Sequence, residues 1–197
     1  LQSTTATNSV LIQSTMPILI LVLNAVFFRT RVAGREWVSV LVSLVGVVII
    51  VSQGQITTLW GSQRSVGDLW ILLAALTWAT YSVCLRWRPQ ELDAKAFLGF
   101  TLVVGWMALL QLYLSEYQHA APITWSWPIW LTVGYVAIFP SALAFLFWNR
   151  GVEAIGANAA GHFAHLMPVF GTLMAVVFLG EQFRGFHALG AVLVALG

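Results

Sequence analysis

The segment ATNSVLIQSTMPILILVLNAVFF, residues 6–28, has a second version 151 residues later, ANAAGHFAHLMPVFGTLMAVVFL, residues 157–179. Both versions contain a Met-Pro pair, and the apolar and loop segments around the two pairs coincide. Seven positions are identical over residues 6–46: Ala6/Ala157, Met16/Met167, Pro17/Pro168, Val26/Val177, Phe27/Phe178, Gly34/Gly185 and Gly46/Gly197. The chain therefore contains an internal repeat of an apolar unit.

The composition is that of a membrane protein. The chain of 197 residues is 59% hydrophobic and 8% charged, whereas an ordinary soluble domain is about 25% charged. The net charge is only +2, and the sequence has no run of Lys and Arg that could bind nucleic acid. Cys84 is the only cysteine, so an intrachain disulfide is excluded. No cofactor is expected.

Seven apolar stretches are separated by short polar loops, and about 20 apolar residues form a membrane-spanning helix. The stretches cover about residues 6–28, 35–54, 67–87, 95–115, 127–148 and 157–179, with a last one from about residue 186. They predict an all-α, polytopic transmembrane helix bundle. Because the last stretch has only about a dozen residues and Leu1 is not an initiator methionine, we expect a fragment of a longer membrane protein.

Lys and Arg in the short loops predict the orientation, since cytoplasmic loops carry an excess of positive charge. One set of alternate loops contains Arg29, Arg31, Arg35, Arg86, Arg88, Lys95 and Arg150. The other set contains only Arg64 and Arg184. We therefore expect the first set to be cytoplasmic.

The two copies of the repeat lie five spans apart, so they should run antiparallel in the bilayer. Such inverted repeats are typical of secondary transporters. A repeat unit of five helices predicts a complete protein of ten helices in two inverted five-helix repeats. The chain would then divide into residues 1–54 of the first repeat, an extracytoplasmic linker at 55–66, and the second repeat at 67–197.

The second half contains a set of short motifs: Pro140-Ser141-Ala142-Leu143-Ala144, Trp148-Asn149-Arg150-Gly151, Met167-Pro168 and Leu179-Gly180-Glu181, with Gly190 and Gly197 beyond. These motifs resemble those of the EamA-like branch of the drug/metabolite transporter superfamily. The resemblance implies ten helices in two inverted five-helix repeats, in a protein that moves small metabolites across the inner membrane. In one departure, the acid at Glu181 has Thr30 as its counterpart in the first half, where the family usually repeats an acid.

Polar residues in the segment 157–179 and in its counterpart indicate a candidate substrate-binding site. Asn158, His162 and His165 are spaced i, i+4 and i+7 on one helix face, and Thr172 lies two turns further along. In the first copy, Ser14 matches His165. Since imidazoles are costly against lipid, this stripe should face a central cavity between the two copies. The alternative is that both histidines only bond to neighbouring helices.

Aromatic residues and prolines complete the candidates. Trp78 and Tyr81 lie near the middle of the span 67–87, and their rings would suit an amphipathic organic solute, although ordinary packing is an equal alternative. Pro17, Pro168 and Pro140 interrupt helix hydrogen bonding and are candidate hinges.

The sequence thus favours a transporter that moves a small organic solute, such as an amino acid or a drug, across the plasma or bacterial inner membrane by alternating access. Its partners would be that solute and the lipid bilayer, and it would catalyse no covalent chemistry. An intramembrane metalloenzyme using His162 and His165 is one alternative. A metal site needs three or four ligands, so no metal site is expected here. A membrane scaffold subunit is the other alternative.

Overall fold

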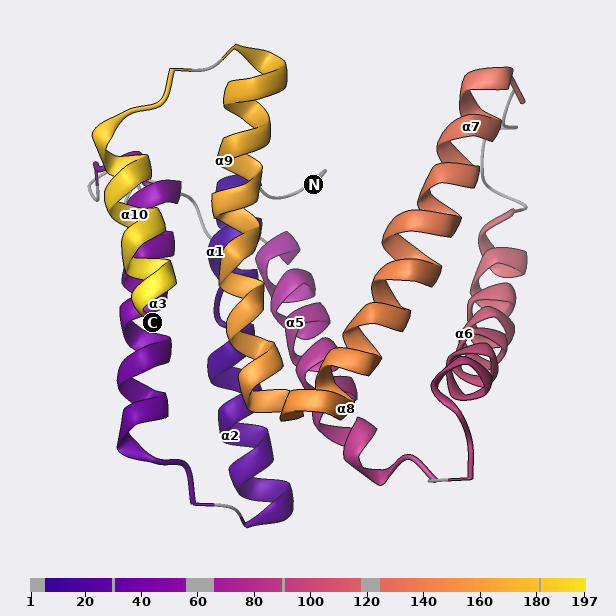
Figure 1. Cartoon of the computed structure of the whole chain (residues 1–197). Coiled ribbons are helices and arrows are strands. Elements are labelled where there is room, and N and C mark those ends of the chain that lie inside the picture. The colour runs from indigo at the N-terminus through magenta and orange to yellow at the C-terminus, as the bar shows by residue number, and fades with distance from the viewer. Residues whose placement is uncertain (1–5, 30, 56–65, 90, 118–124, 181) are drawn as a thin grey trace. The chain divides into compact units, whose positions relative to one another are not determined.

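The computed structural model describes all residues except 1–5, 30, 56–65, 90, 118–124 and 181. Within the described residues every regular element is a helix (Figure 1). The chain forms two compact units, which we call unit 1, Leu1–Cys84 with Ile155–Gly197, and unit 2, Leu85–Ala154. The predicted all-helical fold is confirmed.

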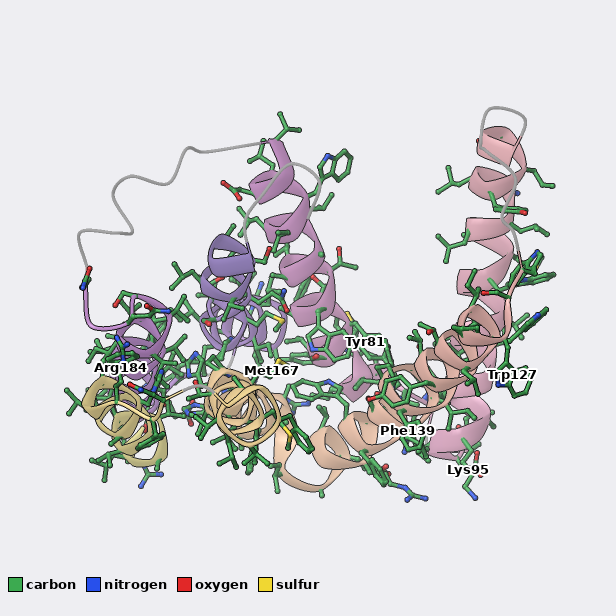
Figure 2. All side chains as sticks on the ribbon, turned by 90° about the horizontal axis from the view of Figure 1, so that it is seen from above. Tyr81, Lys95, Trp127, Phe139, Met167 and Arg184 are labelled. Atoms are coloured by element: carbon green, nitrogen blue, oxygen red, sulfur yellow. The ribbon has the colours of Figure 1, made fainter. Side chains whose placement is uncertain are left out.

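Unit 1 contains both copies of the repeat. Its elements are α1 (Ala6–Gln13), α2 (Met16–Phe28), α3 (Gly34–Val51), α5 (Val66–Cys84), the end of α8 (Ala144–His162), η3 (Phe163–His165), α9 (Leu166–Leu179) and α10 (Gly185–Leu196). Helix α10 packs along α3, α5 packs against α1 and α2, and α9 contacts α3 and α10. Figure 2 shows α3, α9 and α10 nearly end-on, with Met167 near the start of α9 and Arg184 just before α10.

Unit 2 contains η1 (Leu85–Trp87), α6 (Ala94–Tyr117), α7 (Trp127–Val136), η2 (Ala137–Leu143) and the first part of α8. Pro140 lies inside η2, a π-helical segment that joins α7 to α8 without a loop. Proline provides no N–H for the helix ladder, and a wider turn accommodates that loss. Arg88 and Glu153 form an ion pair with a nitrogen–oxygen distance of 2.6 Å, which ties the segment after η1 to α8.

Both copies of the repeat are interrupted just before their Met-Pro pair, where the sequence predicted continuous helices. In the first copy α1 ends at Gln13 and α2 begins at Met16. In the second copy the 3₁₀ segment η3 separates α8 from α9. The physical reason is the same in both, because a proline cannot bond to the carbonyl four residues earlier and its ring collides with it. Each proline instead lies in the first turn of a new helix, where the missing N–H costs little.

The described residues at the two ends of the loops after the copies also have equivalent backbone conformations. The residue after α2, Arg29, has φ 50°, and the residue after α9, Gly180, has φ 70°, both in the left-handed region. Four residues later the chain is extended at Ala33 and at Arg184, and the next helix begins. The repeat is therefore present in the conformation as well as in the sequence.

Helices α3 and α10 cross in close contact through small residues. A Cβ added to Gly46 would lie 2.6 Å from Gly190 O and 2.9 Å from Val194 N. A Cβ on Gly197 would collide with the equivalent atoms of the first copy, Ser39 O and Ser43 N. Gly197 is the equivalent of Gly46, and Ser39 and Ser43 are the equivalents of Gly190 and Val194. The two contacts are therefore the same contact made once by each copy, as a two-fold relation between the copies requires. Small residues at such crossings allow the backbones of membrane helices to approach each other closely.

The sequence prediction of a loop at residues 149–156 was wrong, because α8 runs through it to His162. The backbone departs from helical geometry at Gly156, whose φ of 83° and ψ of 158° suit a residue without a Cβ. In the part of the chain that the structure describes, five helical stretches are long and apolar enough to cross a membrane, and the longest, Trp127–Phe178, contains 52 residues. At 1.5 Å per residue, 52 residues exceed twice the thickness of the hydrocarbon core, which is about 30 Å. The stretch is therefore too long for a single span, and its helical geometry is interrupted at Gly156.

The division into repeats at residues 1–54 and 67–197 stays a prediction. Units 1 and 2 are defined by spatial contact, whereas repeats are defined by equivalence along the chain, so the units do not test that division. Most of the predicted linker at residues 55–66 lies outside the described residues.

Candidate functional site

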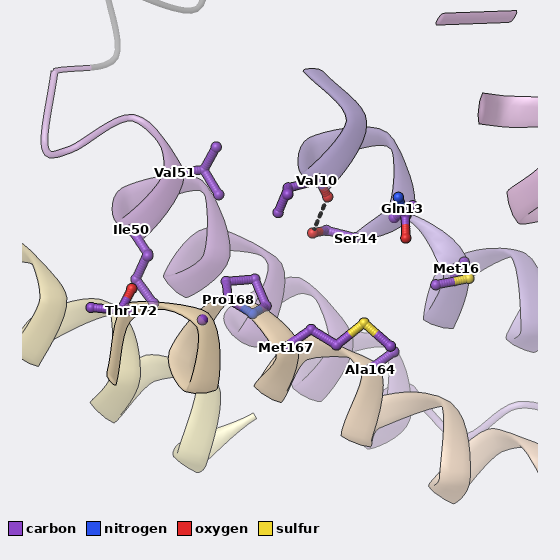
Figure 3. A pocket seen from close by; sticks show the side chains of 11 residues that line it. Val10, Gln13, Ser14, Met16, Ile50, Val51, Ala164, Met167, Pro168 and Thr172 are labelled. Carbon is purple, nitrogen blue, oxygen red and sulfur yellow. Dashed lines mark hydrogen bonds between the residues drawn. The ribbon is translucent and has the colours of Figure 1, made fainter. Parts of the chain in front are cut away.

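A pocket of about 300 Å³ lies in unit 1 beside the interruptions of both repeat copies (Figure 3). Its walls come from α1, α2, α3, η3 and α9. The lining residues are Val10, Gln13, Ser14, Met16, Ile50, Val51, Ala164, Met167, Pro168, Gly171 and Thr172. Most of these side chains are apolar, and Gln13, Ser14 and Thr172 provide the polar groups. We call this space the central pocket.

The central pocket lies where the two copies meet. It is lined by both members of two equivalent pairs, Gln13 with Ala164 and Met16 with Met167. Two equivalent residues can line the same small space only when that space lies close to the symmetry axis that relates the copies. The pocket is therefore at the interface of the repeats.

A third equivalent pair, Ser14 and His165, is in direct contact. His165 Nε2 lies 2.9 Å from Ser14 O, and the His165 side chain is completely buried. Because a carbonyl can only accept, Nε2 carries the proton and donates. The interruption between α1 and α2 leaves carbonyl groups without helical partners, and His165 supplies one of them with a donor. Among the described residues, His165 Nδ1 has no hydrogen-bond partner.

A second space in unit 1, of about 570 Å³, is more polar, and we call it the polar pocket. It is lined by Asn24, Arg35, Glu36, Ser39, Ile155, Gly156, Ala157, Asn158, Ala159, His162 and Gly197. A chain of side-chain hydrogen bonds joins three helices there. Asn24 Nδ2 donates to Asn158 Oδ1 at 2.9 Å, and Asn158 Nδ2 donates to Glu36 Oε2 at 3.2 Å.

The structure distributes the predicted stripe over these two pockets. Asn158 and His162 line the polar pocket, and His162 Nδ1 lies 3.3 Å from Gly197 O. Ser14 and Thr172 line the central pocket, and His165 is buried beside Ser14. The prediction that one cavity would collect the stripe does not fit this arrangement. A 3₁₀ turn has three residues instead of 3.6, so η3 rotates the residues after it away from the face predicted for an α-helix.

The two aromatic candidates lie on α5. The ring centroids of Trp78 and Tyr81 are 6.0 Å apart, and neither ring lines either pocket. Trp78 is half-buried against a small core that contains Met16 and Ala164, two residues of the central pocket wall. Trp78 therefore supports that wall from behind.

The structure adds three residues that the sequence analysis did not select: Gln13, Asn24 and Glu36. Glu36 lies in the first turn of α3, where it is half-buried and hydrogen-bonded to Asn158. Its only sequence signal is an acid in the first turn of an apolar helix. Glu181 and Thr30, which differ from the family pattern, lie outside the described residues.

The EamA-like transporter family matches residues 1–52 and 65–197, which is nearly the whole sequence. The chain belongs to the EamA-like transporter family. It is accordingly a multi-pass membrane protein, in agreement with the five long apolar helical stretches found among its described residues.

Curated relatives in the EamA-like family are named as transporters without a stated substrate. The chain is 28% identical over 197 residues to the uncharacterized transporter YyaM of Bacillus subtilis, and it covers 64% of that protein. It is 26% identical over 194 residues to the uncharacterized inner membrane transporter YicL of Salmonella typhimurium, covering 98% of this chain and 63% of YicL. The chain thus spans less than two thirds of the length of these relatives.

A solved crystal structure has the same fold. It superposes with a TM-score of 0.75 at 22% identity, and the match covers 96% of this chain and 63% of the other. At this identity the likeness concerns the fold alone.

Proposed function

We propose that the chain carries the repeat interface of an inner-membrane transporter that moves a small organic solute by alternating access. The central pocket is the proposed solute site. The observation that carries the proposal is the paired interruption: two equivalent helices break at equivalent Met-Pro pairs beside one pocket. In many secondary transporters discontinuous helices surround a substrate site at the interface of inverted repeats.

The lining of the central pocket limits the kind of solute. A volume of about 300 Å³ is at the lower end of the usual range for small-molecule sites, so a metabolite fits and a large drug does not. The walls are mostly apolar, and Ser14 Oγ already bonds to Val10 O at 2.7 Å. Gln13 and Thr172 then remain to orient a polar group. The proposed solute is a small molecule with an apolar body and one polar end.

The proposed hinges are the two interruptions. Pro17 and Pro168 keep each helix from forming a continuous hydrogen-bond ladder, so a change of angle there breaks few bonds. Equivalent hinges in the two copies allow one end of the pocket to close as the other opens. Pro140 lies in unit 2 within the π segment, where it is a candidate for a separate bend.

Filling the central pocket tests the proposal. Gly171 lines the pocket, and a Cβ added there meets nothing within 4 Å, so Gly171→Leu should occupy the space without moving the backbone. Proteoliposomes containing the whole protein would be loaded with a cell metabolite extract, and the loss of each compound would be followed by mass spectrometry. We expect the variant to slow release of the transported compound at least about tenfold, which corresponds to a binding penalty of 1.4 kcal/mol or more.

Gly99→Leu is the matched control, since a Cβ at Gly99 in α6 also meets nothing within 4 Å and Gly99 does not line the pocket. This control should release the compound at the wild-type rate. Normal release by Gly171→Leu, at a normal level of folded protein, would refute the assignment of the central pocket.

A further inference from the structure

The polar pocket brings together polar and charged side chains from three helices. Two amides, a carboxylate, an imidazole and a guanidinium from α2, α3 and α8 line one space of about 570 Å³. That volume is well within the range of small-molecule sites and far larger than one inorganic ion. A cavity with several convergent polar groups is the usual form of a small-molecule binding site.

The hydrogen bonds of this pocket are directed toward Glu36. Asn24 donates to Asn158, and Asn158 donates to Glu36 Oε2, so the amides hold the carboxylate in place. Within the described part of the chain, Glu36 Oε1 has no hydrogen-bond partner. The fixed carboxylate therefore has an acceptor left for a ligand.

The two charged residues of the pocket differ in how firmly they are placed. Glu36 is half-buried and hydrogen-bonded, whereas Arg35 is exposed at the rim. The charged head of a long exposed side chain stays hydrated, so its field inside the pocket is weaker than that of a fixed, partly buried group. The field in the pocket should therefore favour a positive ligand.

We propose that the polar pocket is a binding site for a small organic cation with a protonated amine, separate from the central pocket. Glu36 accepts the charged hydrogen bond of the ammonium group. Asn158 positions the carboxylate, and the remaining walls from Ile155 to Ala159 contact the organic part of the ligand. Failure of this proposal would leave the assignment of the central pocket unchanged, because the two spaces share no lining residue.

A cysteine inside the pocket can report its charge preference without any transport assay. Ser39 lines the pocket, and Cys84 is the only native cysteine, so the reporter is Ser39→Cys in a Cys84→Ser background. The purified protein in detergent would be treated with two thiosulfonate reagents of similar size, one carrying a trimethylammonium group and the other a sulfonate. At Ser39→Cys we expect the ratio of the cationic to the anionic reaction rate to be at least about tenfold higher than the same ratio for a free thiol. The reason is that a nearby carboxylate attracts the cationic reagent.

Two charge variants give opposite expectations. Glu36→Gln retains an oxygen for Asn158 and should lower the cation-to-anion rate ratio at Ser39→Cys toward that of free thiol. Arg35→Gln removes the opposing charge and should raise the ratio. A reporter in the central pocket, Gln13→Cys, should respond to neither change. A ratio that is unaffected by Glu36→Gln, or that falls equally in both charge variants, would overturn the proposal.

Protection of the reporter tests binding itself. Benzylamine, which is protonated at neutral pH, should slow modification of Ser39→Cys by an uncharged maleimide, and benzyl alcohol at the same concentration should not. The protection should disappear in Glu36→Gln. Equal protection by the amine and the alcohol would show that the pocket selects no charge and would contradict the proposal.

Discussion

Replacing Gly46 with valine is expected to disrupt the packing of α3 against α10 and to destabilise the protein. The Cβ would lie 2.6 Å from Gly190 O and 2.9 Å from Val194 N, which are backbone atoms that cannot rotate away. Overpacking a close contact costs about 1–3 kcal/mol, and more where the backbone must move. We expect a loss of about 3 kcal/mol, measured as a fall of roughly 10 °C in the thermal unfolding midpoint in detergent.

Gly99→Val is the control for the intrinsic effect of valine in a helix, since a Cβ at Gly99 meets nothing within 4 Å. Gly46→Ala should give an intermediate loss, because it adds the colliding Cβ but no branches. If Gly46→Val and Gly99→Val unfold at the same temperature, then α3 and α10 do not approach each other as described.

The second large effect is expected at His165. Alanine there leaves Ser14 O without its donor and creates a hole where a buried imidazole was. An unpaired buried group costs about 1–3 kcal/mol and the cavity adds to it, so we expect a loss of about 3 kcal/mol and little transport activity. Thermal unfolding and release from proteoliposomes measure the two effects.

His165→Gln should recover much of both properties, because the glutamine amide donates from a similar position. His162→Ala should cost much less stability, since His162 is half-buried and its contact with Gly197 O is long at 3.3 Å. Equal losses in His162→Ala and His165→Ala would contradict the different roles that the structure gives these two residues.

The sequence indicated equivalent positions in the two copies because Met-Pro pairs and glycines mark backbone conformations that depend on local chemistry. Pro17 and Pro168 cannot donate to the helix ladder, which accounts for the two interruptions, although continuous helices were expected there. The form of each interruption could not be predicted. A turn between α1 and α2 and a 3₁₀ segment between α8 and α9 satisfy the same constraint. The loop predicted at residues 149–156 failed because polar residues at a membrane surface also suit the end of a helix.

The site was harder to predict because it depends on which helices pack together. A periodicity of 3.6 put Asn158, His162 and His165 on one face, and a short 3₁₀ turn separates them in the structure. Glu36 could not be selected from sequence, since its importance depends on Asn158, a residue 122 positions away in the chain. Contacts between distant helices have no local sequence signal.

The central claim is that the two copies are inverted in the membrane, and the equivalent loops after α2 and α9 test it most directly. Ala33 and Gln182 are exposed, uncharged residues of these loops. Each would be replaced by cysteine in a Cys84→Ser background, and intact cells would be treated with a membrane-impermeant thiol reagent. We predict that Gln182→Cys is labelled from outside and that Ala33→Cys is labelled only after the cells are permeabilised. Labelling of both cysteines from the same side would contradict the inverted repeat and the transport mechanism based on it.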